Sequence, residues 1–258
     1  GDTVLLSSDV RFLRFPRGVD GRPPNFAEAL IDAVLSAVGP EGTLLVPAFS
    51  SSAWFVPRSS QVDLEISSLT TSGHVASALL KRKETVRSLH PTNSWAALGP
   101  RAAEILKFHT PAAHTHRPIE DLVRFGGKQL LVGCINTAPG FSAVHLAQIH
   151  LGLAQRNLAS DRIVARYVDA YGENRTFRKR DVPGCSRGFG RLYDSYRNEG
   201  VLKEGRVAKA NSMMIGADDC YRIAREALLL DPTCVSCRDE RCADCSILKR
   251  YSRGRRLA

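Results

Sequence analysis

The chain has 258 residues, of which 43% are hydrophobic, and it carries a formal net charge of +10 at pH 7. A chain of this length can bury one substantial core, so we expect one globular domain with a small addition. No apolar run approaches the roughly 20 residues of a membrane-spanning helix, and no signal pattern opens the chain, so we expect a cytoplasmic protein with no membrane partner.

Segments with strand and helix spacing alternate along the chain. Residues 3–10 (TVLLSSDV) and 42–50 (GTLLVPAFS) predict buried strands, and residues 26–39 (FAEALIDAVLSAVG) have helical apolar spacing. Because Gly1 is not an initiator and a strand pattern is already under way there, we expect further residues before it. The remaining predicted elements are helices at 74–83, 96–108 and 216–232, a strand at 127–135 and a small β-rich excursion at 166–190. This order predicts an α/β fold with three layers, α/β/α, around a central mixed sheet.

Short polar groups follow several of these strands. Ser7 and Ser8 end the first strand. Pro47 marks the end of the next strand, because proline has no N–H to donate to a central strand pair. In residues 89–94 (LHPTNS), a proline precedes two hydroxyls and an amide. Active sites in α/β sheets collect at the carboxyl ends of strands. Two interpretations stay open: polar strand ends and turns, or contacts to a ligand.

Residues 141–150 (FSAVHLAQIH) hold two histidines in an apolar run compatible with a helix. Helical positions three apart share a face, so His145 can contact Gln148 while His150 projects elsewhere. Histidine suits proton acceptance, because its ordinary pKa of about 6.5 leaves the ring largely neutral near pH 7.

Two CxxC pairs, four residues apart, stand near the C-terminus in CVSCRDERCADC. Four thiolates make a closed tetrahedral site that is typical of structural Zn²⁺. An iron–sulfur cluster and reduced thiols are the alternatives, and a cytoplasmic setting disfavours permanent disulfides. We therefore expect a structural zinc in a C-terminal four-cysteine knuckle, bound by Cys234, Cys237, Cys242 and Cys245.

The other three cysteines and the histidines of residues 108–116 do not indicate a metal site. Cys134, Cys185 and Cys220 are expected to be small buried hydrophobes. The histidines of residues 108–116 (FHTPAAHTH) lack the spacing of a metal motif, and we expect a polar loop that lines the cleft.

Half of the excess positive charge lies in the last ten residues, KRYSRGRRLA, which carry five basic side chains and no acid. Such a run is typical of a solvated end, and it can also attract nucleic acid, an acidic carrier protein or a phosphate-bearing ligand. Basic and aromatic residues are not interleaved and no RNA-binding signature is present, so nucleic-acid binding is not expected.

The order of several blocks resembles the aminoglycoside 3-N-acetyltransferase family, which has the antibiotic N-acetyltransferase fold. The blocks are GDTVLLSSDV, VGPEGTLLVPAFS, SLHPTNSWAALGPRA, GGKQLLVGC, FSAVHLAQ and GRVAKANSMMIGADD, and the likeness extends to Asp231. The patterns HPxxSxxAxG, GPxGTLxxPxFS and HxA carry most of its specificity. The resemblance implies an enzyme that moves an acetyl group from acetyl-CoA to an amine on a small-molecule acceptor.

The resemblance also implies a role for individual residues. It puts the general base at His145 and its orienting partner at Gln148. Ser94 is the first candidate for an acetyl-CoA contact. The full set implied on the cofactor side is Ser7, Ser8, Pro47, Ala48, Phe49, His90, Pro91, Asn93 and Ser94.

Two positions depart from the family's pattern. Gln148 stands where the family usually has a glutamate, so His145 lacks a negative charge behind it and is expected to be a weaker base. Three interpretations stay open: the acceptor amine has a lower pKa, another carboxylate takes over, or catalysis has been lost and binding kept. Gly188 stands where a histidine is common, on the acceptor side. The positive charge of the chain also favours an acceptor less basic than an aminoglycoside.

Two alternatives to an acetyl-CoA-dependent N-acetyltransferase stay open. The basic tail would suit a biosynthetic acyltransferase whose donor is an acidic acyl carrier protein. The two departures would suit a non-catalytic ligand-binding homologue. In each case we expect a catalytic-type domain at residues 1–231, the knuckle at 232–248 and a tail at 249–258. The sequence does not determine the acceptor, the acyl group or the oligomeric state.

Overall fold

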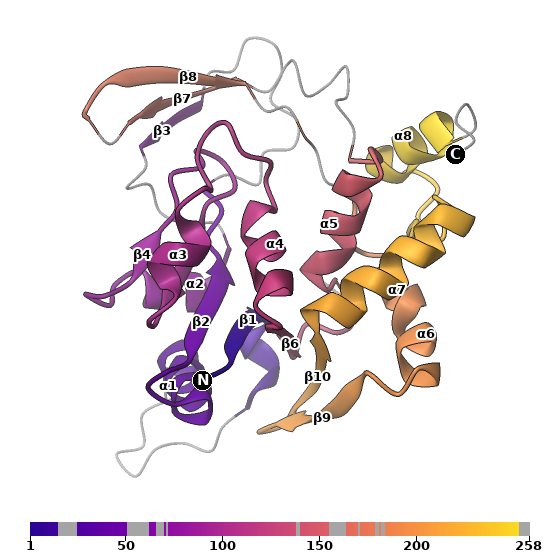
Figure 1. The fold of residues 1–258 in the computed structure, drawn as a ribbon, viewed down its shortest axis with the longest axis horizontal. Helices are drawn as coiled ribbons and strands as arrows, with labels where there is room; N and C mark the ends of the chain where they lie inside the picture. Colours follow the sequence, from indigo (N-terminus) through magenta and orange to yellow (C-terminus); the bar gives the residue numbers. More distant parts are fainter. Residues whose placement is uncertain are drawn as a thin grey trace.

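The computed structural model describes residues 1–14, 25–50, 62–65, 70, 72–137, 140–154, 164–169, 171–178, 181 and 184–252. Its central sheet contains β1 (Thr3–Ser8), β2 (Thr43–Pro47), β4 (Val86–Arg87), β5 (Trp95–Leu98), β6 (Lys128–Val132), β9 (Lys203–Val207) and β10 (Ala210–Gly216). The strand order is β4-β5-β2-β1-β6-β10-β9 (Figure 1). β1 is parallel to both of its neighbours, whereas β5 and β10 pair in antiparallel fashion, so the sheet is mixed as predicted.

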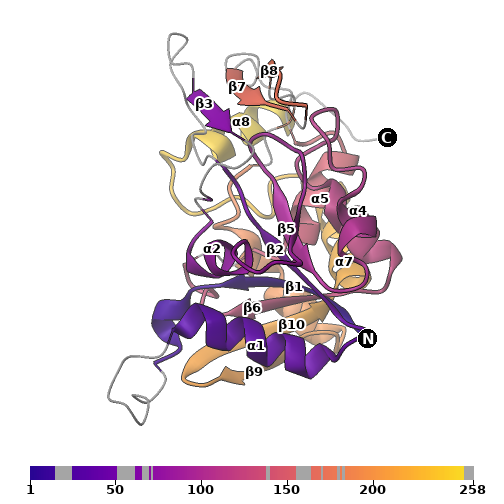
Figure 2. The same cartoon turned by 90° about the vertical axis from the view of Figure 1, so that its left-hand side faces the viewer.

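Hydrophobic side chains cover both faces of this sheet, because successive residues of a strand point to opposite faces. Leu5 and Leu45 belong to one buried cluster, and Val4 and Leu44 belong to another. The second cluster is covered by α1 (Phe26–Val38) and α2 (His74–Leu79), and the first by α3 (Ala102–Leu106), α4 (Arg117–Arg124), α5 (Ser142–His150) and α7 (Ala217–Leu230). Figure 2 shows α1 crossing in front of the sheet, with α4, α5 and α7 grouped to one side. The predicted three-layer α/β/α fold is confirmed.

The helix predicted at residues 96–108 is wrong in its first part. Trp95–Leu98 forms β5, which pairs with β2, and only Ala102–Leu106 is helical. Alanine favours helices in isolation, but Ala96 and Ala97 are fully buried in the ladder. Gly99 separates the two elements at φ +128°, a value that side-chain-bearing residues rarely adopt.

A second sheet corresponds to the predicted β-rich excursion. β7 (Val164–Val168) and β8 (Asn174–Arg178) pair in antiparallel fashion, and β3 (Val62–Glu65), which the sequence did not predict, adds in parallel to β7. The excursion ends before residue 190, because a 3₁₀ helix (Phe189–Leu192) begins there and leads into α6 (Tyr193–Asn198).

The C-terminal part packs on the same body. The predicted helix at 216–232 is α7, and α8 (Ala243–Ser252) follows after a turn. Leu248 of α8 belongs to the same buried cluster as α5 and α7. Since α8 runs through the predicted boundary between residues 248 and 249, the start of the tail is helical; residues 253–258 lie outside the described residues. None of the helices in the described ranges combines the length and apolarity needed to cross a bilayer.

Candidate active site

The helix that carries the candidate base is held by the sheet. α5 begins after Phe141, whose side chain provides no cap. Instead, the buried Gln129 of β6 accepts a hydrogen bond at Oε1 from the Ala143 backbone N–H, at 3.0 Å. This bond satisfies one of the backbone donors that a helix start leaves without an intrahelical acceptor. β6 therefore helps to fix the position of the first turn of α5.

His145 and Gln148 meet on one face of α5, as the helical spacing predicts. His145 Nδ1 lies 3.1 Å from Gln148 Oε1. An amide oxygen only accepts hydrogen bonds, so Nδ1 carries the ring proton and the lone pair lies on Nε2. Gln148 therefore selects the tautomer in which Nε2 can accept a proton. His150 points away, and its ring contacts Tyr221 and Glu120.

Aromatic rings surround His145. The ring centroids of His116 and Phe189 lie 4.8 Å and 4.6 Å from that of His145. This burial lowers the pKa of His145 to about 4, against the opposing effect of the Gln148 hydrogen bond, because little can replace the water around a charged imidazolium. His145 as a whole residue is half-buried, while its imidazole is desolvated enough to lower the pKa. At neutral pH the ring is therefore uncharged, with a lone pair on Nε2, and it is a weak base.

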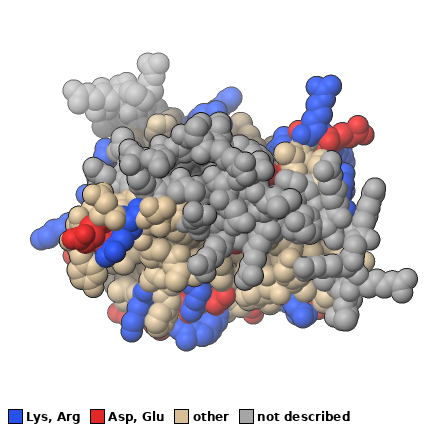
Figure 3. Space-filling view, turned by 90° about the horizontal axis from the view of Figure 1, so that it is seen from above, with Lys and Arg blue, Asp and Glu red and all other residues tan. Residues whose placement is uncertain are grey.

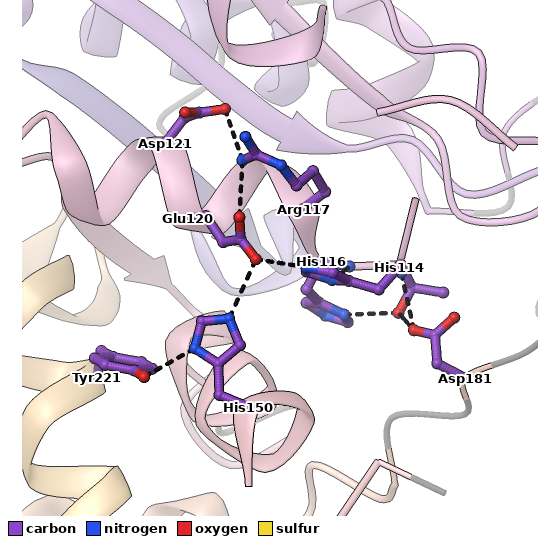
Figure 4. A network of polar contacts seen from close by, with 9 residues as sticks. His114, His116, Arg117, Glu120, Asp121, His150, Asp181 and Tyr221 are labelled. Carbon is purple, nitrogen blue, oxygen red and sulfur yellow. Dashed lines mark hydrogen bonds and ion pairs between the residues drawn. The ribbon is translucent and has the colours of Figure 1, made fainter. Parts of the chain in front are cut away.

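The carboxylate of Asp181 is linked to the His116 ring by the hydroxyl of Thr115. Asp181 Oδ2 accepts hydrogen bonds from the Thr115 hydroxyl at 2.6 Å and from the Thr115 backbone N–H at 2.9 Å. The hydroxyl has one proton, which it donates to Asp181, so its oxygen accepts from His116 Nδ1 at 3.0 Å. Figure 4 shows Asp181 directed at this loop. Sequence reasoning missed this link, since Asp181 and Thr115 are remote along the chain.

We expect Asp181→Asn to lower the free energy of unfolding by roughly 1–3 kcal/mol, because hydrogen bonds to a charged acceptor are among the stronger ones. It should also lower kcat, since His116 beside His145 loses its support. Urea unfolding and steady-state kinetics measure the two effects. Asp169→Asn is the matched control, because Asp169 likewise accepts two hydrogen bonds, from the backbone N–H groups of Tyr171 and Glu173, but lies at the β7–β8 turn. An Asp181→Asn enzyme with unchanged kcat would exclude Asp181 as the carboxylate that takes over.

The histidines of residues 108–116 differ in exposure. His114 is part-buried and contacts Glu120 at 2.7 Å, and Glu120 also meets His150 and Arg117 (Figure 4). His109 is fully buried, stacks on His90 and contacts Ser88, and burial lowers its pKa to about 3. The predicted polar loop lining the cleft is therefore wrong for His109, which belongs to the interior.

A cavity of about 250 Å³ lies at the carboxyl ends of β1, β2 and β6. Four of the predicted cofactor contacts line it: Ser7, Ser8, Pro47 and Phe49. Cys134, which follows β6, also lines it. Pro47 is the last residue of β2, as predicted from its missing N–H donor.

The remaining predicted cofactor contacts are buried and are not among the residues that line this cavity: Ala48, His90, Pro91, Asn93 and Ser94. The Ser94 hydroxyl donates to the Ala48 carbonyl at 2.6 Å and accepts from Arg87 Nε at 3.0 Å. His90 Nδ1 accepts from the Asn93 backbone N–H at 3.1 Å. The Ser94 hydroxyl thus connects its segment to the chain that follows β2, and direct contact of Ser94 with acetyl-CoA stays a prediction.

Arg87 bonds to the same segments as Ser94, and the sequence did not indicate this role. Its Nη2 donates to the Ala48 carbonyl and to the Ser50 hydroxyl, each at 3.0 Å. Burial lowers the pKa of Arg87 without removing its charge at neutral pH. One guanidinium thus ties β4 to the segment that follows β2.

The cysteine prediction needs a correction. Cys237, Cys242 and Cys245 come together, but the fourth member of the cluster is Cys185, and Cys234 is elsewhere. Cys234 packs instead against the buried cluster of α5 and α7. The sequence interpretation failed because spacing reveals only ligands that are close along the chain, and Cys185 comes from the loop before the 3₁₀ helix.

Comparisons with known proteins identify the family of the chain. The family model of aminoglycoside 3-N-acetyltransferase matches residues 18–229. Aminoglycoside N(3)-acetyltransferase IX of Micromonospora chalcea is 26% identical, over 86% of this chain and 88% of its own length. Aminoglycoside N(3)-acetyltransferase VIII of Streptomyces fradiae is 28% identical, over 88% and 85%.

Solved structures show the same fold. A gentamicin complex of aminoglycoside acetyltransferase AAC(3)-IVa has a TM-score of 0.75 at 23% identity, covering 97% of this chain and 90% of that one. A binary complex of AAC-IIIb with CoASH has a TM-score of 0.63 at 22% identity, covering 88% and 90%. With the family model spanning most of the sequence, the chain belongs to the aminoglycoside 3-N-acetyltransferase family, whose members are acetyl-CoA-dependent N-acetyltransferases.

Proposed function

We propose that this protein transfers the acetyl group of acetyl-CoA to an amino group of an aminoglycoside or a related amino sugar, with His145 as general base. The observation that carries the proposal is the 3.1 Å contact between His145 Nδ1 and Gln148 Oε1. It leaves a lone pair on Nε2, and the ring is neutral at pH 7 because burial lowers its pKa to about 4. The curated relatives are all named as acetyltransferases of aminoglycosides at N(3), which supports the 3-amino group as the target.

In the proposed reaction the acceptor nitrogen attacks the thioester carbonyl. His145 Nε2 takes a proton from the nitrogen as the new C–N bond forms, and the carbonyl oxygen carries the negative charge of the tetrahedral intermediate. The C–S bond then breaks, CoA leaves as a thiolate, and the imidazolium returns the proton. Gln148 keeps its hydrogen bond to Nδ1 throughout.

The proposed cofactor side is the cavity lined by Ser7, Ser8, Pro47 and Phe49. Hydroxyls and backbone amides at strand ends suit the amide and phosphate groups of the CoA arm, and the Phe49 ring provides apolar surface. The complex of a structural neighbour with CoASH supports a CoA site in this fold. Structural zinc stays a prediction.

The net positive charge does not argue strongly against a cationic acceptor. Ion pairs such as Arg82 with Glu28 and Asp32, Arg197 with Glu204 and Arg222 with Glu199 are already counted in the net charge, so the location of the excess is what matters. On the described part of the face in Figure 3, both basic and acidic side chains are visible near its edge. Half of the excess charge lies in the last ten residues.

The direct test is thiol release from acetyl-CoA across a panel of aminoglycosides and other amino sugars, with mass spectrometry of the product. The proposal expects one added acetyl group, located on the 3-amino nitrogen. Release only with a loaded acyl carrier protein would favour the biosynthetic alternative. CoA binding without any turnover would favour a non-catalytic homologue.

We expect Gln148→Glu to raise kcat at neutral pH, on the order of 10-fold, because a carboxylate stabilises the imidazolium that forms in the transition state. It should also raise the pKa of His145 above the wild-type value of about 4. The wild-type ring would lose activity through protonation only as the pH falls toward 4, and the variant would do so at higher pH. Imidazole ¹⁵N NMR titration measures this change, and thiol release measures the rate.

Gln148→Met is the matched control, because it keeps the length of the side chain and removes the acceptor oxygen. The tautomer is then no longer fixed, and kcat is expected to fall. If Gln148→Glu lowers kcat and Gln148→Met leaves it unchanged, Gln148 has no role in orienting the base.

A further inference from the structure

The thiols of Cys185, Cys237, Cys242 and Cys245 form a cluster at the C-terminal end of the described chain. Their four sulfur atoms lie within 4.8 Å of one another, and none of these cysteines forms a disulfide. Cys237, Cys242 and Cys245 are buried, and Cys185 is half-buried. We infer that these four side chains bind one Zn²⁺ ion, with Cys185 in place of Cys234.

The distances fit a single tetrahedral ion. With Zn–S bonds of about 2.3 Å, two thiolates on one tetrahedral zinc lie about 3.8 Å apart. The sulfur atoms of Cys237 and Cys245 are 3.6 Å apart, and the whole set stays within 4.8 Å. Four thiolates leave no open position, so the ion would be structural.

Backbone and side-chain donors already surround the sulfur atoms. The Cys237 N–H points at Cys245 Sγ at 3.3 Å, and the Arg187 N–H points at Cys185 Sγ at 3.4 Å. The Arg187 guanidinium also donates to Cys185 Sγ at 3.4 Å. Four thiolates around Zn²⁺ carry two net negative charges, and the arginine offsets part of that charge. Donors of this kind stabilise thiolate ligands and orient them.

The ion would join two segments that already touch closely. A Cβ at Gly188 would lie 2.1 Å from the Val235 carbonyl oxygen, so the loop before the 3₁₀ helix packs backbone to backbone against the knuckle. Phe189 follows at once, and its ring contacts His145. Zinc would therefore tie one wall around His145 to the C-terminal segment.

Metal analysis of the whole chain tests the site. Wild-type protein from zinc-supplemented cells is expected to contain about one zinc per chain. Since loss of an outer partner alone weakens metal binding about 10- to 100-fold, loss of a ligand in Cys185→Ser should weaken it further. Cys234→Ser is the matched control and should keep its zinc. Co²⁺ substitution should give the absorption of tetrahedral four-thiolate coordination, and Cys185→His, which keeps a zinc ligand, should retain the ion with an altered spectrum.

Three results would overturn the inference. One is zinc that is retained in Cys185→Ser and lost in Cys234→Ser. Another is metal-free protein whose four thiols all react with a thiol reagent while the fold is intact. The third is iron with inorganic sulfide in place of zinc. Removing the ion with a chelator should also lower kcat, and this expectation rests on the proposed function. The metal content and the Co²⁺ spectrum test the zinc site independently of that function.

Discussion

Replacing His145 by alanine is expected to lower kcat by about 100- to 10,000-fold, the range typical of losing a general base. The ring is the proton acceptor in the proposed reaction, and its Nε2 lone pair is set by the Gln148 contact. The KM for acetyl-CoA should change little, because the cavity at the strand ends is lined by other residues. Thiol release under saturating acetyl-CoA measures kcat directly.

His150→Ala is the matched control for this experiment. His150 lies on the same helix, but it is exposed and contacts Tyr221 and Glu120. Its removal should leave kcat within roughly twofold, in line with a surface substitution away from the chemistry. If His145→Ala keeps wild-type kcat, His145 is not the base and the proposed mechanism fails.

Replacing Gly188 by alanine is expected to destabilise the protein by about 2–3 kcal/mol, the cost of forcing extra atoms into a closely packed site. The backbone conformation is ordinary, at φ −93° and ψ −3°, so the obstacle is space rather than strain. The added Cβ would meet the Val235 carbonyl oxygen at 2.1 Å and the Ser236 carbonyl carbon at 2.6 Å. Both are backbone atoms, so relief requires the two loops to separate.

Thermal unfolding measures this effect, at roughly 2–4 °C of Tm for each kcal/mol in a protein of this size. Gly184→Ala is the control, since nothing lies within 4 Å of a Cβ at that position. Equal Tm values for the two variants would show that the loops do not pack as described. The contact leaves no room for a side chain at position 188 unless the two loops move apart.

The parts of the fold that were predictable are those in which one local pattern dominates. β1, β2 and β6 have continuous apolar runs because both faces of the sheet are covered, and α5 shows its contact face through a three-residue spacing. β5 was missed because its alanines favour a helix locally, and only pairing with β2 makes them a strand. Tertiary pairing outweighs propensity in such segments.

The candidate site was predictable in its helix and in part of its cavity wall. Asp181, Arg87 and Cys185 were missed for a common reason: each acts through a partner that is distant along the chain. Asp181 bonds to Thr115, Arg87 bonds to the segment after β2, and Cys185 lies beside the C-terminal knuckle. Contacts between such distant residues produce no recognisable spacing in the sequence. Their roles follow only from the folded arrangement.

The hydrogen bond from the Ala143 N–H to Gln129 holds the start of α5 directly on β6. The helix that carries His145 is anchored to a strand of the sheet, so the connection between β6 and α5 is not its only support. The first turn of α5 thus stays on the sheet through a bond that does not depend on that connection. The position of His145 is in this way coupled to the buried interior of the molecule through the central sheet.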